Sequence, residues 1–315
     1  MENYKSEHSE SKKMGGLAKR NRQKLTFYWL MFAPLLLQFL IFYVYINFQS
    51  FALAFQKFDY DKGAFVANGF RNFTAIFKKF GEDGGSFQSS IVNSLELFFW
   101  TLVFGSALAI FFSYYIYKKH PGAGIFKIVL YTPHIVSSVV FVIMYMYFVD
   151  RAVPAFYEKI TGEYIMGLLD NQATERGMIM FFNIWISFGT QVLMYTGAMS
   201  GISDSIIESG ELDGITPLKE LIFIVLPSIW QTFITFMVVS VVNLFTNQMS
   251  LYAFYGTHAE KNLHTFGYYL YIEVLQAQNP QYPELSALGL LLTAVAVPLT
   301  LGVRWALNKF GPKTV

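Results

Sequence analysis

The chain has 315 residues, of which 54% are hydrophobic and only 14% are charged, whereas soluble domains carry about 25% charged residues. This balance excludes an ordinary soluble domain and is typical of a polytopic membrane protein. The formal net charge of +2 gives no indication of nucleic acid binding. The absence of cysteine excludes a disulfide framework, a thiolate metal site and cysteine chemistry.

Six apolar runs are long enough to cross a hydrocarbon core of about 30 Å. None shows the alternating pattern of a membrane barrel, so they predict α-helices and an all-α fold. Prolines at positions 34, 133 and 298 are compatible with this, because neighbouring helices can satisfy the freed backbone groups. The predicted spans are approximately residues 26–48, 91–117, 125–149, 178–200, 228–248 and 285–307.

The segment before the first span, residues 1–25, is a basic tail with seven Lys or Arg side chains. Because Lys and Arg are enriched in cytoplasmic segments, this tail predicts a cytoplasmic N-terminus. The six helices of residues 26–309 then return the C-terminus, residues 310–315, to the same side. The first apolar run lacks a small-x-small cleavage site, so we expect it to remain as a span and not to be removed as a signal peptide.

The longest outside loop, residues 49–90, contains an aromatic pattern of its own. Phe70, Phe73 and Phe77 share one face at helical spacing, while Arg71 and the lysines at 78 and 79 lie elsewhere. This predicts a short helix at the membrane interface, with a plain surface loop as the alternative.

Residues 205–227 form a polar segment between two apolar runs, with Glu208, Glu211 and Asp213 close together. Ser205 and Glu208 have the S-x-x-E spacing of a capping box, which predicts the start of a short helix. Gly214 supplies a turn, and Thr216-Pro217 fits the N-cap and first position of the next helix. We therefore expect a helix-turn-helix at the cytoplasmic membrane surface that presents carboxylates to the aqueous phase.

This segment resembles the EAA loop (about residues 201–227) of binding-protein-dependent ABC importer permeases of the maltose-type carbohydrate family. Glu208 takes the first place of the pattern, Asp213-Gly214 the centre, and the I-x-L-P end falls on residues 224–227. Ser209 and Gly210 replace the two usual alanines. Two looser matches support the resemblance: residues 69–73 resemble a G-x-x-N-F element, and residues 267–271 resemble a stretch that faces the solute receptor. An ordinary acidic loop between two spans is the alternative.

The resemblance implies a permease subunit that is not an enzyme, in the inner or plasma membrane of a prokaryote. The implied partners are a second six-helix permease chain forming a heterodimer, two cytoplasmic ABC ATPases, an extracellular or periplasmic solute-binding protein, membrane lipid, and a carbohydrate such as an oligosaccharide or glycoside. The sequence contains no G-x-x-x-x-G-K-[ST] loop, so ATP and Mg would be bound by the ATPases, and we expect no cofactor or metal in this chain. The residues implied to couple the loop to the ATPase are Glu208, Ser209, Gly210, Asp213, Gly214 and Pro227.

Polar residues inside the spans are the candidates for the transport pathway, because such residues are costly in lipid and usually face a bundle interior or water. The best placed are Thr190, Gln191, Tyr195, Asn243 and Asn247, which lie on the two spans that flank the acidic loop. The alternative for each is a hydrogen bond that only joins neighbouring helices. We expect Glu96 to reach the outer boundary, His134 to be a packed, hydrogen-bonded helix residue, and Gly189, Gly197 and Gly201 to allow close helix packing.

Other functions stay open on the residues alone. A permease for glycerol phosphate or another small polar solute would have the same layout. A secondary transporter would need an ion relay within the membrane, but Glu96 is the one carboxylate within the predicted spans. A membrane-embedded enzyme would need paired catalytic residues, and the sequence offers none that we can identify.

Overall fold

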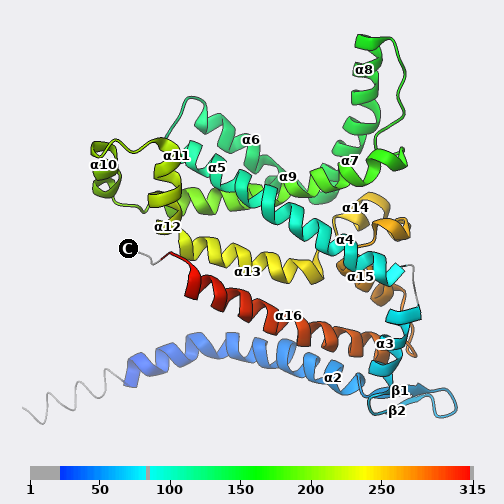
Figure 1. Ribbon diagram of the computed structural model, residues 1–315. Helices are drawn as coiled ribbons and strands as arrows, with labels where there is room; N and C mark the ends of the chain where they lie inside the picture. The colour runs from blue at the N-terminus through cyan, green and yellow to red at the C-terminus, as the bar shows by residue number, and fades with distance from the viewer. Residues whose placement is uncertain (1–21, 83–85, 313–315) are drawn as a thin grey trace, which may run out of the picture.

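The computed structural model describes residues 22–82 and 86–312, which are almost entirely helical (Figure 1). Five described helices are long and apolar enough to cross a membrane, and a bent helix pair gives a sixth candidate. The predicted all-α class with membrane-spanning helices is therefore confirmed. The unbroken candidates are Arg22–Leu53, Phe87–Tyr117, Ser138–Thr161, Gln172–Met199 and Tyr282–Phe310.

Several of these long helices contain π-helical turns. The first includes η1 (Phe39–Tyr45) and α2 (Ile46–Leu53), and the second consists of α4 (Ser86–Trp100), η2 (Thr101–Gly105) and α5 (Ser106–Tyr117). The candidates Gln172–Met199 and Tyr282–Phe310 are the single α-helices α9 and α16. Most of the predicted basic tail lies outside the described residues, and residues 22–25 are already helical.

The predicted third span, residues 125–149, is wrong as one continuous helix. The chain breaks between α6 (Ala123–Ile135) and α7 (Ser138–Tyr147), because Val136 and Ser137 adopt extended backbone angles. Pro133 removes a helical hydrogen bond just before this break. The helix that does continue runs through α7, η3 (Phe148–Ala152) and α8 (Val153–Thr161). Hydropathy does not detect this break, because the residues on both sides of it are apolar.

The predicted fifth span, residues 228–248, corresponds to α13 (Trp230–Thr246), but a sharp bend precedes it. The helix Pro217–Ser228, made of α11 (Pro217–Glu220), η4 (Leu221–Val225) and α12 (Leu226–Ser228), meets α13 at 77°. Pro227 lies within α12, next to the bend at Ile229. The acidic segment is thus joined to this span through an angular connection.

The two ends of the bundle carry different elements (Figure 1). One end holds the start of the first helix, the end of α16, α10 (Asp204–Leu212) and α11. The other holds the hairpin β1 (Gln56–Asp59)–β2 (Ala64–Ala67), α3 (Arg71–Glu82), α8, α14 (Leu251–Tyr255), η5 (Lys261–Leu263) and α15 (Phe266–Gln276). The hairpin is antiparallel, with Gln56 opposite Ala67. The described chain ends and the acidic segment therefore share one end.

Helix α9 is the centre of the packing, because its residues belong to two hydrophobic clusters. Ile179 and Phe182 pack in a cluster with α7 and α14, and Val192 and Tyr195 pack in a second cluster with α5, α6 and η4. Ala109 of α5 is fully buried, as expected where small residues let helices approach closely. The first helix is exposed along its length, as expected of a surface in contact with lipid.

Candidate functional site

The acidic segment folds into a helical elbow, defined here as residues 204–220. Helix α10 is followed by a turn at Gly214, which has φ +71°, and then by α11 with Thr216 at the N-cap and Pro217 next. These features match the prediction, although the Thr216 side chain makes no capping hydrogen bond.

The predicted capping box of Ser205 and Glu208 is wrong. Helix α10 begins at Asp204 with Ser203 as the N-cap, and the Ser203 and Ser205 hydroxyl oxygens are 2.8 Å apart. Residues 203–205 are all good N-cap residue types, so spacing alone could not choose among them.

The structure explains why a glycine occupies position 210, which the sequence alone did not. As a helix-interior glycine it costs about 1 kcal/mol relative to alanine. However, it is buried, and a Cβ atom there would lie 2.7 Å from Ile224 Cδ1 and 3.3 Å from Ile215 Cγ2. Glycine therefore lets α10 pack closely against η4.

The outer surface of the elbow combines carboxylates with large apolar side chains. Glu208, Ser209 and Asp213 are exposed, and Glu208 forms no ion pair within the part of the chain that the structure describes. Leu212 is 90% exposed and Leu218 is 67% exposed. An exposed surface of this composition is suited to contact another protein.

A buried ion pair that the sequence analysis missed joins the elbow to α5. Lys118 Nζ lies 2.7 Å from Glu220 Oε1 and 3.3 Å from Glu211 Oε1. The side chain of Glu220 is 4% exposed, whereas that of Glu211 is 60% exposed. Burial alone would lower the pKa of Lys118, but the adjacent carboxylates of Glu220 and Glu211 raise that pKa above its ordinary value. About a hundred positions separate the partners, so no local pattern indicates the pair.

A second candidate site is a cavity of about 250 Å³ within the bundle, bounded by α4, η2, α6, α9 and α13. Its wall includes Phe98 and Phe236, and no Lys, Arg, Asp or Glu is among its described lining residues. The polar side chains that line it are Ser94, Thr101, His134, Ser187, Thr190, Gln191, Ser240, Asn243 and Asn247. The cavity therefore offers neutral hydrogen-bonding groups beside aromatic rings. We call it the polar cavity.

Four of the five predicted pathway residues, Thr190, Gln191, Asn243 and Asn247, line the polar cavity. The side chain of Gln191 is buried, and its Oε1 atom has no hydrogen-bond partner in the described chain. Such an atom is costly to leave unsatisfied, so it is a candidate to accept a hydrogen bond from a transported molecule. Asn247 Oδ1 already accepts from the Met249 amide, which gives this residue a local structural role as well.

Tyr195 does not line the polar cavity. It is fully buried and packs edge-on against Phe236, with ring centroids 5.1 Å apart. Sequence position could not separate it from its neighbours, because the helix face turned to the cavity depends on how the other helices pack.

His134, expected to be a packed, hydrogen-bonded helix residue, lies in α6 next to the break and also lines the polar cavity. Its ring nitrogens lie 3.2 and 3.3 Å from Thr190 Oγ1. Gly189 allows this approach, because a Cβ there would lie 2.6 Å from the Leu130 carbonyl oxygen and 2.8 Å from His134 Nε2. Close packing was also predicted for Gly197 and Gly201, but a Cβ would have open space at Gly197 and would meet just the Ala198 carbonyl oxygen at Gly201.

Two other polar residues in the second span have structural partners. Glu96 forms an ion pair with Arg176 of α9, so it is held within the described chain. Asn93 Nδ2 donates to the carbonyl oxygens of Asn262 and His264, at 2.6 and 2.9 Å. The observed helices also extend further than predicted, so the candidate spans contain further carboxylates, at Asp150, Glu158, Glu175 and Glu284. Of these, Glu175 is buried in the first turn of α9.

The two looser sequence matches are structural elements. In the G-x-x-N-F element, Asn72 is buried and its Nδ2 donates to the carbonyl oxygens of Ala54 and Gln56, both at 2.7 Å. Gly69 has φ +61° before the predicted short helix, which is α3. Gly267 of α15 lies so close to the end of α13 that a Cβ would be 2.5 Å from the Thr246 carbonyl.

Comparisons with known proteins identify the family. Residues 101–315 match the family described as "Binding-protein-dependent transport system inner membrane component". This match covers more than half of the chain, so the chain belongs to that family and is a multi-pass membrane component of such a transport system.

Named relatives agree with this assignment. The arabinooligosaccharides transport system permease protein AraP of Bacillus subtilis (strain 168) is 24% identical over 281 residues, which cover 87% of this chain and 86% of that protein. A crystal structure of a bacterial ABC transporter involved in the import of the acidic polysaccharide alginate is 21% identical, with a TM-score of 0.74 over 93% of this chain and 99% of that chain. A bacterial alginate ABC transporter in complex with alginate pentasaccharide-bound periplasmic protein is 20% identical, with a TM-score of 0.75 over 94% of this chain and 99% of that chain. These two structures establish a shared fold.

Proposed function

We propose that this chain is the permease subunit of an ATP-driven importer that takes up a neutral oligosaccharide or glycoside. The observation that carries the substrate class is the neutral lining of the polar cavity. Hydroxyl, amide and imidazole groups can exchange hydrogen bonds with sugar hydroxyls, and the rings of Phe98 and Phe236 can pack against the apolar faces of a sugar. The arabinooligosaccharide relative supports the same class.

The absence of charge in this lining disfavours two alternatives. A permease for glycerol phosphate would be expected to place Arg or Lys near the phosphate, and a carrier of uronic acid chains would be expected to place them near the carboxylates. Neither residue type is among the described residues around the polar cavity. An import pathway for a neutral sugar needs neither.

The elbow is the part of the chain that would receive energy from a separate ATPase. Its end of the bundle would face the cytoplasm, as the basic tail predicts. Glu208 would pair with a basic residue of the ATPase, and Leu212 and Leu218 would pack beside that contact. The buried Lys118–Glu220 pair and the 77° bend would pass the movement of the elbow to α5 and α13. A second permease chain and an external solute-binding protein would complete the importer.

Uptake competition tests the substrate class. Cells that express the complete importer would take up a labelled neutral oligosaccharide, and an excess of other neutral oligosaccharides would compete. Competition by a uronate oligosaccharide or glycerol phosphate, with none by neutral sugars, would contradict the proposal.

A pair of matched variants tests the polar cavity. Asn243→Ala should raise the solute concentration for half-maximal uptake several-fold, because it removes an amide from the cavity lining. Gln231→Ala is the control, since it removes an exposed amide from the same helix outside the lining. Equal uptake curves for the two variants would remove Asn243 from the pathway.

A further inference from the structure

A second hollow lies on the other side of the wall that bounds the polar cavity. It has a volume of about 350 Å³ and is lined by side chains of α3, α4, α13, α15 and α16. Ser94 and Leu244 belong to the walls of both hollows. We call this second hollow the apolar groove.

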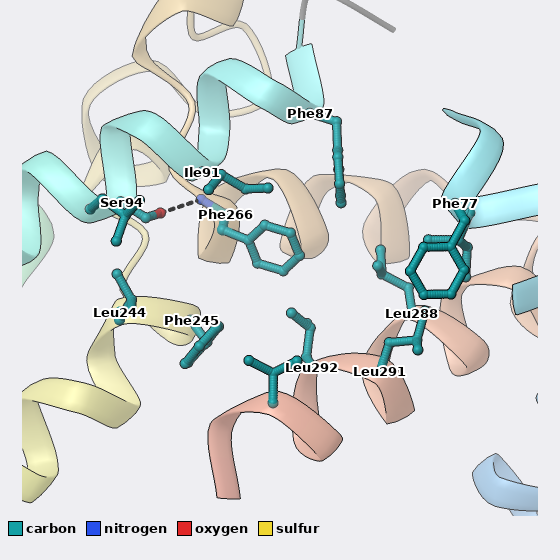
Figure 2. A pocket seen from close by; sticks show the side chains of 13 residues that line it. Phe77, Phe87, Ile91, Ser94, Leu244, Phe245, Phe266, Leu288, Leu291 and Leu292 are labelled. Atoms are coloured by element: carbon teal, nitrogen blue, oxygen red, sulfur yellow. Dashed lines mark hydrogen bonds between the residues drawn. The ribbon is translucent and has the colours of Figure 1, made fainter. Parts of the chain in front are cut away.

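The lining of the apolar groove is almost entirely hydrocarbon. Figure 2 shows Phe77, Phe245, Phe266 and Leu292 approaching it from four different helices. Ser94 is the one polar residue among its described lining side chains, and the Ser94 hydroxyl already accepts a hydrogen bond of 2.8 Å from the Phe266 amide. A sugar would find no hydrogen-bond partner here, whereas a hydrocarbon chain would match the surface.

Two apolar occupants could cover the apolar groove, namely a lipid tail and a helix of the partner permease chain. A lipid tail is joined to a charged headgroup, so the polar residues next to the groove distinguish the two.

A smaller charged hollow adjoins the apolar groove. It has a volume of about 80 Å³ and shares Ile76, Phe87 and Leu288 with the groove. It also contains one cation, Lys79, and four side chains that can accept hydrogen bonds, namely Tyr269, Glu273, Gln281 and Glu284. The apolar groove thus continues into a polar mouth. The mouth is lined from α3, α15 and the start of α16, which lie at the end of the bundle opposite the elbow (Figure 1).

The polar mouth indicates which lipid headgroup would fit. Lys79 Nζ lies 2.5 Å from Glu284 Oε1 but its side chain is 63% exposed, so its remaining N–H groups can still bind a phosphate. Glu273 and Gln281 can accept hydrogen bonds from an ammonium group. An anionic headgroup without an amine would face two carboxylates, and a choline headgroup has no N–H group to donate to them.

We propose that the apolar groove and its polar mouth bind an amine-bearing phospholipid of the phosphatidylethanolamine type. One acyl chain occupies the groove, the phosphate contacts Lys79, and the ammonium group contacts the carboxylates. The bound lipid joins α3 to α4 and α16 on the outer side of the polar cavity wall.

Photo-crosslinking of the assembled importer tests this site. The complex would be reconstituted in phosphatidylcholine vesicles that contain a trace of phosphatidylethanolamine with a photoreactive group in one acyl chain. We expect labelled peptides from α3 and α16, and at least tenfold less labelling there after Leu291→Trp, which fills the groove. Leu301→Trp is the control, because this exposed leucine of the same helix lies outside the groove.

A milder variant tests the headgroup without changing the volume of the groove. Lys79→Gln should reduce the competition advantage of unlabelled phosphatidylethanolamine over phosphatidylglycerol and phosphatidylcholine several-fold, and it serves also if Leu291→Trp does not fold. Equal labelling in the Leu291→Trp and Leu301→Trp complexes would overturn the site. So would labelling that occurs in the isolated chain but is lost in the assembled complex, because the partner chain would then cover the groove.

Discussion

The buried pair between Lys118 and Glu220 should hold the elbow to the rest of the bundle. Replacing Lys118 with Met leaves the Glu220 carboxylate, whose side chain is 4% exposed, without its cation. Removal of one partner of a buried ion pair costs about 3–5 kcal/mol. Because the Lys118 side chain is 22% exposed, water can reach part of the site, and we expect the lower end, about 3 kcal/mol of unfolding free energy.

Two further variants make this prediction selective. Glu211→Gln should cost less than about 1 kcal/mol, because this carboxylate is 60% exposed and 3.3 Å from Lys118. The double variant Lys118→Met with Glu220→Met should recover most of the loss, since it leaves no buried charge unpaired.

The assay is denaturant unfolding of the purified protein in mixed micelles. The raised pKa of Lys118 implies that the contribution of the pair is fully present below the ordinary lysine pKa of about 10.4 and is lost as pH rises through the higher folded-state value. If Lys118→Met and Glu211→Gln cost the same, the pair does not hold the elbow.

The remaining predictions concern other parts of the chain. Glu208→Lys should leave assembly in the membrane intact but abolish uptake, whereas the control Glu158→Lys on the opposite end should transport normally; wild-type uptake with Glu208→Lys would exclude the coupling role. Asn72→Ala should lower the unfolding free energy by about 2 kcal/mol, because the buried Ala54 carbonyl oxygen and the half-buried Gln56 carbonyl oxygen lose their donor; a value near zero in the same micelle assay would contradict this. Burial lowers the pKa of His264, so the stability of the folded protein should fall as pH drops below about 6.5. His264→Gln should reduce that pH dependence in thermal melts, and an unchanged pH profile would exclude His264 as its source.

Hydropathy predicted most of the fold, because a long apolar segment directly indicates a helix that contacts lipid. It failed at Val136 and Ser137, where an apolar sequence contains a backbone break. Local residue preferences predicted the backbone correctly where one residue type is strongly preferred, as at Gly214 with its positive φ. It failed at the start of α10, where three neighbouring residues compete for the N-cap.

The candidate sites depend on contacts that are distant in sequence. Polar residues in spans four and five were recognisable as unusual, and most of them line the polar cavity, but nothing local distinguishes Tyr195 from them. Lys118 and Glu220 each look like ordinary residues at a helix end until packing brings them together. In the sequence alone, Gly210 is only a residue that weakens a helix. The reason for a glycine there is its close contact with Ile224, which belongs to a different helix.

Cysteine crosslinking in membranes can show whether the elbow contacts a separate ATPase. The chain has no native cysteine, so Leu212→Cys provides a single reactive thiol at a side chain that is 90% exposed. We expect this thiol to crosslink to the ATPase and the crosslink to stop uptake, whereas Phe156→Cys at the opposite end should give no ATPase product. A crosslink to the ATPase from Phe156→Cys, with none from Leu212→Cys, would exclude the elbow as the ATPase contact.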